Sequence, residues 1–124
     1  MAQKPRVVIL DDDDIFAALL TASLAPEYDV AVGRSGREGL ELLRGGADLL
    51  ITDIGMADID GIELLGLLDK DPRFGAIPVI IVTATHFNQR PVSEVKRFRQ
   101  VREVICKPCR VEQILVSMRK VLQR

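Results

Sequence analysis

The 124-residue sequence has no long apolar run, no surplus of charge of either sign, and too few cysteines for a disulfide framework. The first apolar run, residues 6–10, is too short for a signal peptide or a membrane span. Seventeen basic side chains nearly balance 18 acidic ones, so the chain has no long-range attraction for nucleic acid. The two cysteines, Cys106 and Cys109, are typical of a reduced protein. We therefore expect a cytoplasmic protein that binds neither nucleic acid nor a membrane.

The composition is that of a globular domain. Hydrophobic residues make up 48% of the chain and charged residues 28%, which is far from the values of disordered or membrane proteins. A chain of this length buries about two-thirds of the surface that it exposes when unfolded, which is enough for one core. We therefore expect a single domain over residues 1–124.

Five short apolar runs rich in Val, Ile and Leu recur along the chain and predict strands. They cover residues 7–10, 28–32, 49–51, 79–82 and 104–105. Three of these runs lack polar alternation, which favours strands buried on both faces, as in a parallel sheet.

Segments with helical spacing lie between and after these runs. A capping-box pattern at Ser35 begins one helix, which Gly45 ends. Asp60 begins another, which closes before Pro72 because the residue before a proline disfavours helical geometry. The remaining predicted helices cover residues 14–25, 90–101 and 111–122. The first of these is apolar nearly all round, which predicts that it is well buried.

Five strands alternating with five helices predict an α/β fold, a doubly wound (βα)5 unit. Its parallel strands form an open sheet with helices on both faces. The functional site of such a sheet lies beyond the carboxyl ends of its strands. Polar residues follow four of the five predicted strands there: Asp11 to Asp14, Asp53, Thr83 with Ala84, and Lys107 with Pro108.

Such an acidic cluster needs a compensating cation. Two carboxylates about 4 Å apart repel by roughly 4 kcal/mol at an effective dielectric constant of 20. Lys107 supplies one positive charge, and a hard divalent ion such as Mg²⁺ can supply more through oxygen ligands. An acidic pocket with Mg²⁺, a lysine and a hydroxyl suits phosphoryl transfer, in which a carboxylate attacks as the nucleophile.

The ordered motifs of the chain resemble those of two-component response-regulator receiver domains, which have a flavodoxin-like fold similar to that of chemotaxis regulators. The matching motifs, in the family's order, are Leu10-Asp11-Asp12-Asp13, Asp48-Leu49-Leu50-Ile51-Thr52-Asp53, Asp60-Gly61, Ile77 to Ala84, and Lys107-Pro108. The resemblance covers nearly the whole chain and implies the strand order 2-1-3-4-5.

The resemblance also implies a role for each site residue. Asp53 is the phosphoacceptor, and a histidine kinase or a histidine phosphotransfer protein is the donor. Mg²⁺ is held by Asp11, Asp12, Asp53 and the backbone carbonyl of Gly55. Thr83 contacts the phosphoryl oxygens, Ala84 leaves room for them, and Lys107 pairs with the developing charge. The protein is then a signalling module that assists its own phosphorylation and dephosphorylation, not a metabolic enzyme.

The chain departs from the family at two positions that matter for signalling. Ala57 stands where many receivers have proline, and Val104 stands where receivers usually have Tyr or Phe. In relatives that aromatic ring moves together with the threonine, and valine has no ring to move. The face of the fourth helix, fifth strand and fifth helix contacts output partners or a second copy in relatives. The departures at Ala57 and Val104 favour an alternative function, that of a degenerate receiver. Such a protein would be a docking module that works without phosphorylation.

Three other patterns point to different chemistry. Cys106-Lys107-Pro108-Cys109 mimics a thiol redox motif, but it lies too late in the chain for that fold. Asp58-Ile59-Asp60-Gly61 mimics a phosphatase motif, but Asp53 already occupies the place directly after the buried strand. His86, the only histidine, lies in a predicted loop, where an exposed polar residue is ordinary.

Overall fold

The computed structural model describes residues 4–56, 58–84 and 92–122. Ala57 and His86 lie outside these described residues, and so do residues 90 and 91 of the predicted fourth helix. Among the described residues, no helix is long and apolar enough to cross a membrane.

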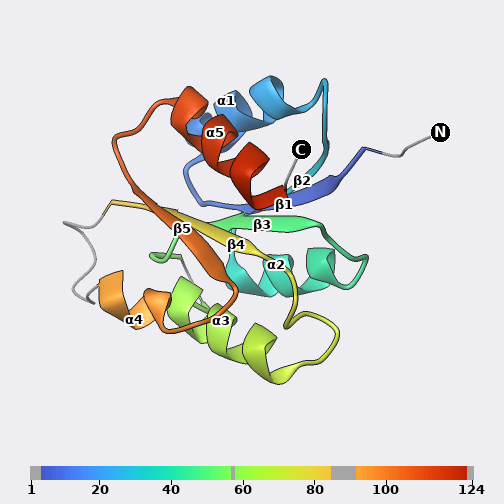
Figure 1. Ribbon diagram of the computed structural model, residues 1–124, viewed down its shortest axis with the longest axis vertical. Helices are drawn as coiled ribbons and strands as arrows, with labels where there is room; N and C mark the ends of the chain where they lie inside the picture. The colour runs from blue at the N-terminus through green and yellow to red at the C-terminus, as the bar shows by residue number, and fades with distance from the viewer. Residues whose placement is uncertain (1–3, 57, 85–91, 123–124) are drawn as a thin grey trace.

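The described part of the chain alternates five strands with five helices, as predicted (Figure 1). The strands are β1 (Arg6–Leu10), β2 (Asp29–Gly33), β3 (Leu49–Thr52), β4 (Val79–Thr83) and β5 (Val101–Cys106). The helices are α1 (Asp14–Leu24), α2 (Gly36–Leu43), α3 (Gly61–Lys70), α4 (Val92–Lys96) and α5 (Val111–Leu122). All strands are parallel and their order in the sheet is β2-β1-β3-β4-β5, which confirms the predicted fold.

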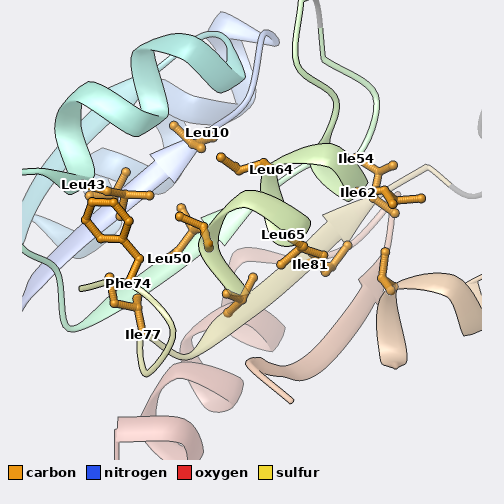
Figure 2. Close-up of a cluster of buried hydrophobic side chains, with 14 of the residues drawn as sticks. Leu10, Leu43, Leu50, Ile54, Ile62, Leu64, Leu65, Phe74, Ile77 and Ile81 are labelled. Carbon is orange, nitrogen blue, oxygen red and sulfur yellow. The ribbon is translucent and has the colours of Figure 1, made fainter. Parts of the chain in front are cut away.

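The sheet separates two hydrophobic layers. Helices α1 and α5 cover one face, and helices α2, α3 and α4 cover the other (Figure 1). Figure 2 shows the second layer, in which Leu50 of β3 packs beside Leu64 and Leu65 of α3. Every residue of β3 and β4 is buried, because these central strands have a helix layer on each side.

The prediction of a helix over residues 90–101 was wrong at its carboxyl end. Helix α4 ends at Lys96, and β5 begins at Val101, three residues before the predicted strand. Gln100 explains the difference, because its buried side chain donates hydrogen bonds to the carbonyls of Phe74 and Ile77. Its own carbonyl accepts from the N–H of Val79, so the chain is already attached to the sheet there.

The prediction that the first helix is well buried was also wrong. Only Ala17, Leu20 and Leu24 of α1 are buried. Ile15 is 75% exposed and Leu19 is 59% exposed. The apolar composition of α1 therefore serves two faces, one that packs on the sheet and one that meets solvent.

Candidate functional site

Three carboxylates meet at the carboxyl ends of β1 and β3. Asp11 and Asp12 follow β1, and Asp53 follows β3. One carboxylate oxygen of each residue lies within 4.8 Å of the other two. Asp11 is only 2% exposed, whereas Asp12 is exposed. The sheet therefore brings together the three side chains predicted to hold a metal ion.

Helix α1 starts directly after this cluster. Asp13 is its N-cap, and one carboxylate oxygen of Asp13 accepts the N–H groups of Ile15 and Phe16, each at 3.1 Å. The N–H of Asp13 in turn donates to Asp11 at 2.9 Å. The capping bonds thus fix the backbone that presents Asp11 and Asp12.

Lys107 supplies the positive charge of the site. Its Nζ lies 2.9 Å from Oδ2 of Asp11 and 3.3 Å from Oδ2 of Asp53. Its backbone N–H donates to the carbonyl of Thr83 at 2.9 Å, which holds the end of β5 beside the end of β4. Lys107 follows β5, the edge strand of the sheet, and its side chain therefore contacts carboxylates at the ends of both β1 and β3.

Phe16 completes the surroundings of Lys107 and was missed by the sequence analysis. Its ring centroid lies 4.6 Å from the Lys107 Nζ, within the range of a cation–π interaction. The aromatic side chain also packs against the α1 and α5 layer. A half-buried ring two residues after the start of α1 has no sequence signal that separates it from an ordinary core residue.

Burial and charge act in opposite directions on the two ionised partners. Burial raises the pKa of Asp11 above its ordinary value, although hydrogen bonds from Lys107 and from the Asp13 backbone partly offset the effect. Burial lowers the pKa of Lys107, but its bonds to Asp11 and its attraction to Asp53 outweigh burial and raise that pKa overall. Lys107 therefore keeps its positive charge. The negative charge of the Asp11 carboxylate is only partly balanced by Lys107, so a further cation would stabilise it.

Asp53 is held in place and still reachable from solvent. Its Oδ1 accepts the backbone N–H groups of Ile54 at 2.6 Å and Gly55 at 3.3 Å. Its own N–H donates to the carbonyl of Leu10 at 3.0 Å. The Asp53 side chain is 13% exposed. Oδ2 of Asp53 thus faces Lys107, and among the described residues no backbone N–H donates a hydrogen bond to it.

The remaining predicted site residues lie near the same rim. Thr83 is buried at the end of β4, and the half-buried Ala84 follows it. Gly55 is exposed in the segment after Asp53, where its N–H points at the Asp53 carboxylate. The roles of the Thr83 hydroxyl, the Ala84 side chain and the Gly55 carbonyl stay predictions.

The donor set fits a hard divalent cation. Asp11, Asp12 and Asp53 offer oxygen ligands only, which suits Mg²⁺ and does not suit a metal that prefers nitrogen or sulfur. The raised pKa of Asp11 points the same way, because an added cation would restore the charge that burial disfavours.

Gly61 fixes the loop that carries Asp53 against helix α3, a role that the sequence analysis did not identify. Its N–H donates to the Ile54 carbonyl at 2.8 Å. A Cβ at this position would lie 2.7 Å from both the Asp53 carbonyl oxygen and the Ile54 Cα. Both are backbone atoms, so no side-chain rotation can move them away from the added Cβ. The absence of a side chain at Gly61 therefore lets α3 approach the loop that follows Asp53.

We expect Gly61→Ala to lower the free energy of unfolding by about 1–3 kcal/mol, because the new methyl group overpacks this contact. Gly66→Ala is the matched control on the same helix, since a Cβ there has no neighbour within 4 Å. The control should be stabilised by about 0.5–1 kcal/mol through helix propensity. Urea unfolding of both variants measures the difference, and equal stability of the two would contradict the close approach.

The two cysteines lie on either side of Lys107 and Pro108, Cys106 at the end of β5 and Cys109 after it. Cys106 and Cys109 are free thiols, one exposed and one half-buried. Burial raises the pKa of the Cys109 thiol, whereas a catalytic thiol has a lowered pKa. The resemblance of the four-residue motif to a thiol oxidoreductase therefore gains no support from the geometry.

Comparison with known proteins matches most of the chain to one protein family. The family model of the response regulator receiver domain matches residues 7–119. The transcriptional regulatory protein GlrR of Escherichia coli is 39% identical over 87 residues, which cover 68% of this chain and 19% of that protein. The DNA-binding dual master transcriptional regulator RpaA of Synechocystis is 30% identical over 122 residues, which cover 97% of this chain and 50% of that protein. The chain thus spans at most half the length of these two relatives.

Solved structures agree with this placement. The receiver domain of response regulator 1452 of Francisella has a TM-score of 0.83 and 25% identity, and the match covers 98% of each chain. The chemotaxis response regulator CheY4 of Vibrio cholerae has a TM-score of 0.85 at 22% identity. That match covers 97% of this chain and all of CheY4, and at this identity it speaks for the fold alone.

Proposed function

Because the chain belongs to the response regulator receiver domain family, a family of signalling modules, we propose that it accepts a phosphoryl group on Asp53. The donor is a phosphorylated histidine of a histidine kinase or of a histidine phosphotransfer protein. One observation carries the proposal: the Lys107 Nζ lies between Asp11 and Asp53, with Asp53 Oδ2 at 3.3 Å.

In the proposed step, Oδ2 of Asp53 attacks the phosphorus atom. A new oxygen–phosphorus bond forms while the phosphorus–nitrogen bond of the donor breaks, and its electron pair stays on the imidazole. The backbone N–H groups of Ile54 and Gly55 hold the other carboxylate oxygen, so the attacking atom has a fixed direction. Lys107 stands where negative charge develops on the phosphoryl oxygens.

Mg²⁺, held by Asp11, Asp12, Asp53 and the Gly55 carbonyl, would supply charge compensation for the transferred group. The exposed Asp12 lies at the solvent side of this proposed site and the buried Asp11 at its base. Thr83 lies at the end of the neighbouring strand, and its hydroxyl is the proposed contact for a phosphoryl oxygen. Ala84, with its small side chain, leaves room beside it.

The exposed face of α1 suits docking of the donor protein. Ile15 and Leu19 project from a helix that begins directly after the acidic cluster. A shallow groove of about 520 Å³ runs along α1 toward Val32 and Arg34. An apolar surface beside the acceptor is the feature that a transient protein–protein contact needs.

The test is the intact mass of the protein after incubation with acetyl phosphate, with and without Mg²⁺. We expect one phosphoryl adduct that requires Mg²⁺ and is absent from Asp53→Asn. The substitution keeps the shape of the side chain but removes the nucleophilic charge, so the variant should fold normally.

The alternative is a degenerate receiver that docks partners without phosphorylation. The half-buried Val104 favours it, because this side chain offers no ring to report on Thr83. A folded protein that binds Mg²⁺ and gives no adduct under any condition would support this alternative and reject phosphorylation.

A further inference from the structure

The Lys107 ammonium has an aromatic neighbour besides its two carboxylates. Its Nζ lies 4.6 Å from the centroid of the Phe16 ring. The other cation–π contacts among the described residues join neighbours in the sequence, at 4.9 and 5.1 Å: Arg73 with Phe74, and Arg97 with Phe98. Phe16 and Lys107, in contrast, come from α1 and from the segment after β5. The fold itself therefore brings this ring and this ammonium together.

The place of the ring is fixed by contacts that do not involve Lys107. The Phe16 N–H donates to the Asp13 carboxylate at 3.1 Å in the first turn of α1, and the Asp13 N–H donates to Asp11 at 2.9 Å. The half-buried ring also packs against the core cluster between the sheet and helices α1 and α5. The turn of helix that follows Asp11 therefore also presents Phe16 to the site.

The Lys107 side chain, in contrast, is long and has a flexible four-carbon stem, so its ammonium needs several contacts to occupy one place. An ammonium has three N–H donors, and the carboxylates of Asp11 and Asp53 accept from it at 2.9 and 3.3 Å. The face of the Phe16 ring carries partial negative charge and attracts the same ammonium. Because the Lys107 side chain is only 19% exposed, water weakens this attraction less than it would at the surface.

Both carboxylates take on other roles in the proposed reaction. Asp53 becomes an acyl phosphate, and Asp11 is a proposed ligand of the metal ion. Their hydrogen bonds to Lys107 therefore do not stay constant while the phosphoryl group is transferred. The Phe16 ring takes no part in the bond changes, and its attraction for the ammonium does not depend on the charge of either carboxylate.

We propose that Phe16 is a positioning residue for Lys107. Its ring keeps the ammonium beside Asp53 while the phosphoryl group arrives, so Lys107 meets the developing negative charge without first having to move. Phe16 acts through Lys107 and forms no bond to the phosphoryl group. The inference rests on the proposed phosphorylation of Asp53 and adds to it a residue outside the acidic cluster.

The experiment changes the electrostatics of the ring separately from its bulk. Phe16→Leu removes the ring, Phe16→Tyr keeps it, and Phe16→trifluorophenylalanine keeps its shape but weakens the negative charge of its face. Phe98→Leu is the matched control, because Phe98 is also a half-buried ring that packs against a core cluster and lies 5.1 Å from the Arg97 guanidinium. Intact mass gives the initial rate of adduct formation with acetyl phosphate and Mg²⁺, and urea unfolding verifies that each variant folds.

We expect Phe16→Leu and Phe16→trifluorophenylalanine to react roughly three- to tenfold more slowly, which corresponds to the loss of one partly buried cation–π contact. Phe16→Tyr and Phe98→Leu should react at the normal rate. In a Lys107→Gln background, Phe16→Leu should cause no further loss, because the ring then has no ammonium to hold. A normal rate in Phe16→Leu would overturn the proposal. So would a normal rate in Phe16→trifluorophenylalanine, or the same loss with Lys107→Gln, since either would give Phe16 a packing role alone.

The order of the Lys107 side chain provides a measurement that needs no phosphorylation. Carbon-13 relaxation of the Lys107 Cε methylene group reports this order in the unphosphorylated protein. We expect a lower order parameter in Phe16→Leu and an unchanged one in Phe98→Leu. Absence of the adduct from the unaltered protein would reject phosphorylation of Asp53, whereas unchanged order of Lys107 in Phe16→Leu would reject the positioning role. The two proposals therefore fail separately.

Discussion

Replacing Lys107 by glutamine is expected to slow phosphorylation of Asp53 by roughly 10²–10³-fold, the loss typical of removing one group that stabilises a developing negative charge. Lys107 is the one described cation within ion-pair distance of both Asp11 and Asp53. Glutamine can still donate hydrogen bonds, but it carries no charge to balance the incoming phosphoryl oxygens. The initial rate of adduct formation with acetyl phosphate, followed by intact mass, measures the effect.

Two controls test whether the slower reaction has another cause, namely the change of net charge or a loss of Mg²⁺ binding. Lys70→Gln makes the same change of charge on the exposed end of α3 and should leave the rate unchanged. The rise in melting temperature on adding Mg²⁺ should persist in Lys107→Gln, because the carboxylates that are proposed to bind the ion are intact. A variant that reacts at the rate of the unaltered protein would contradict the proposed role of Lys107.

The sequence predicted the sheet well because burial and sequence agree there. Strands β3 and β4 are buried along their whole length, and their uninterrupted apolar runs admit few other structures. The boundary between α4 and β5 failed for the opposite reason. Gln100 belongs to the sheet edge through long-range hydrogen bonds to Phe74 and Ile77, and a glutamine carries no local signal for such bonds.

The site shows the same division. Asp11, Asp53 and Lys107 each follow a strand, and the carboxyl ends of parallel strands lie on the same side of the sheet. Their proximity could therefore be predicted from the positions where the strands end. The contact of Phe16 with Lys107 and the close approach of Gly61 depend on how two helices pack on the loops. Helix packing is set by distant side chains, and no pattern within either helix reports it. Exposure of Ile15 and Leu19 was missed likewise, because an all-round apolar helix does not show which face is covered.

Replacing Leu50 by alanine is expected to lower the free energy of unfolding by about 2–5 kcal/mol. Leu50 is fully buried in β3 and pairs with Val8 of β1 and Val79 of β4. It also packs in the cluster with Leu64 and Leu65 (Figure 2). Its removal leaves a cavity between the sheet and α3 that rigid neighbours fill only in part. Urea unfolding monitored by circular dichroism measures the loss.

Leu67→Ala is the matched control, since it deletes the same atoms from a side chain of α3 that is 45% exposed. Its cost should stay below about 1 kcal/mol, because little apolar surface is lost and no closed cavity forms. The two variants should also differ in melting temperature by roughly 10 °C. Below their unfolding transitions both should form the Asp53 adduct at the normal rate, because the backbone bond from Asp53 to Leu10 is independent of either side chain. Equal costs for the two leucines would contradict the packing of β3 against α3. A slowed reaction in Leu50→Ala alone would instead mean that this core layer also positions the acceptor.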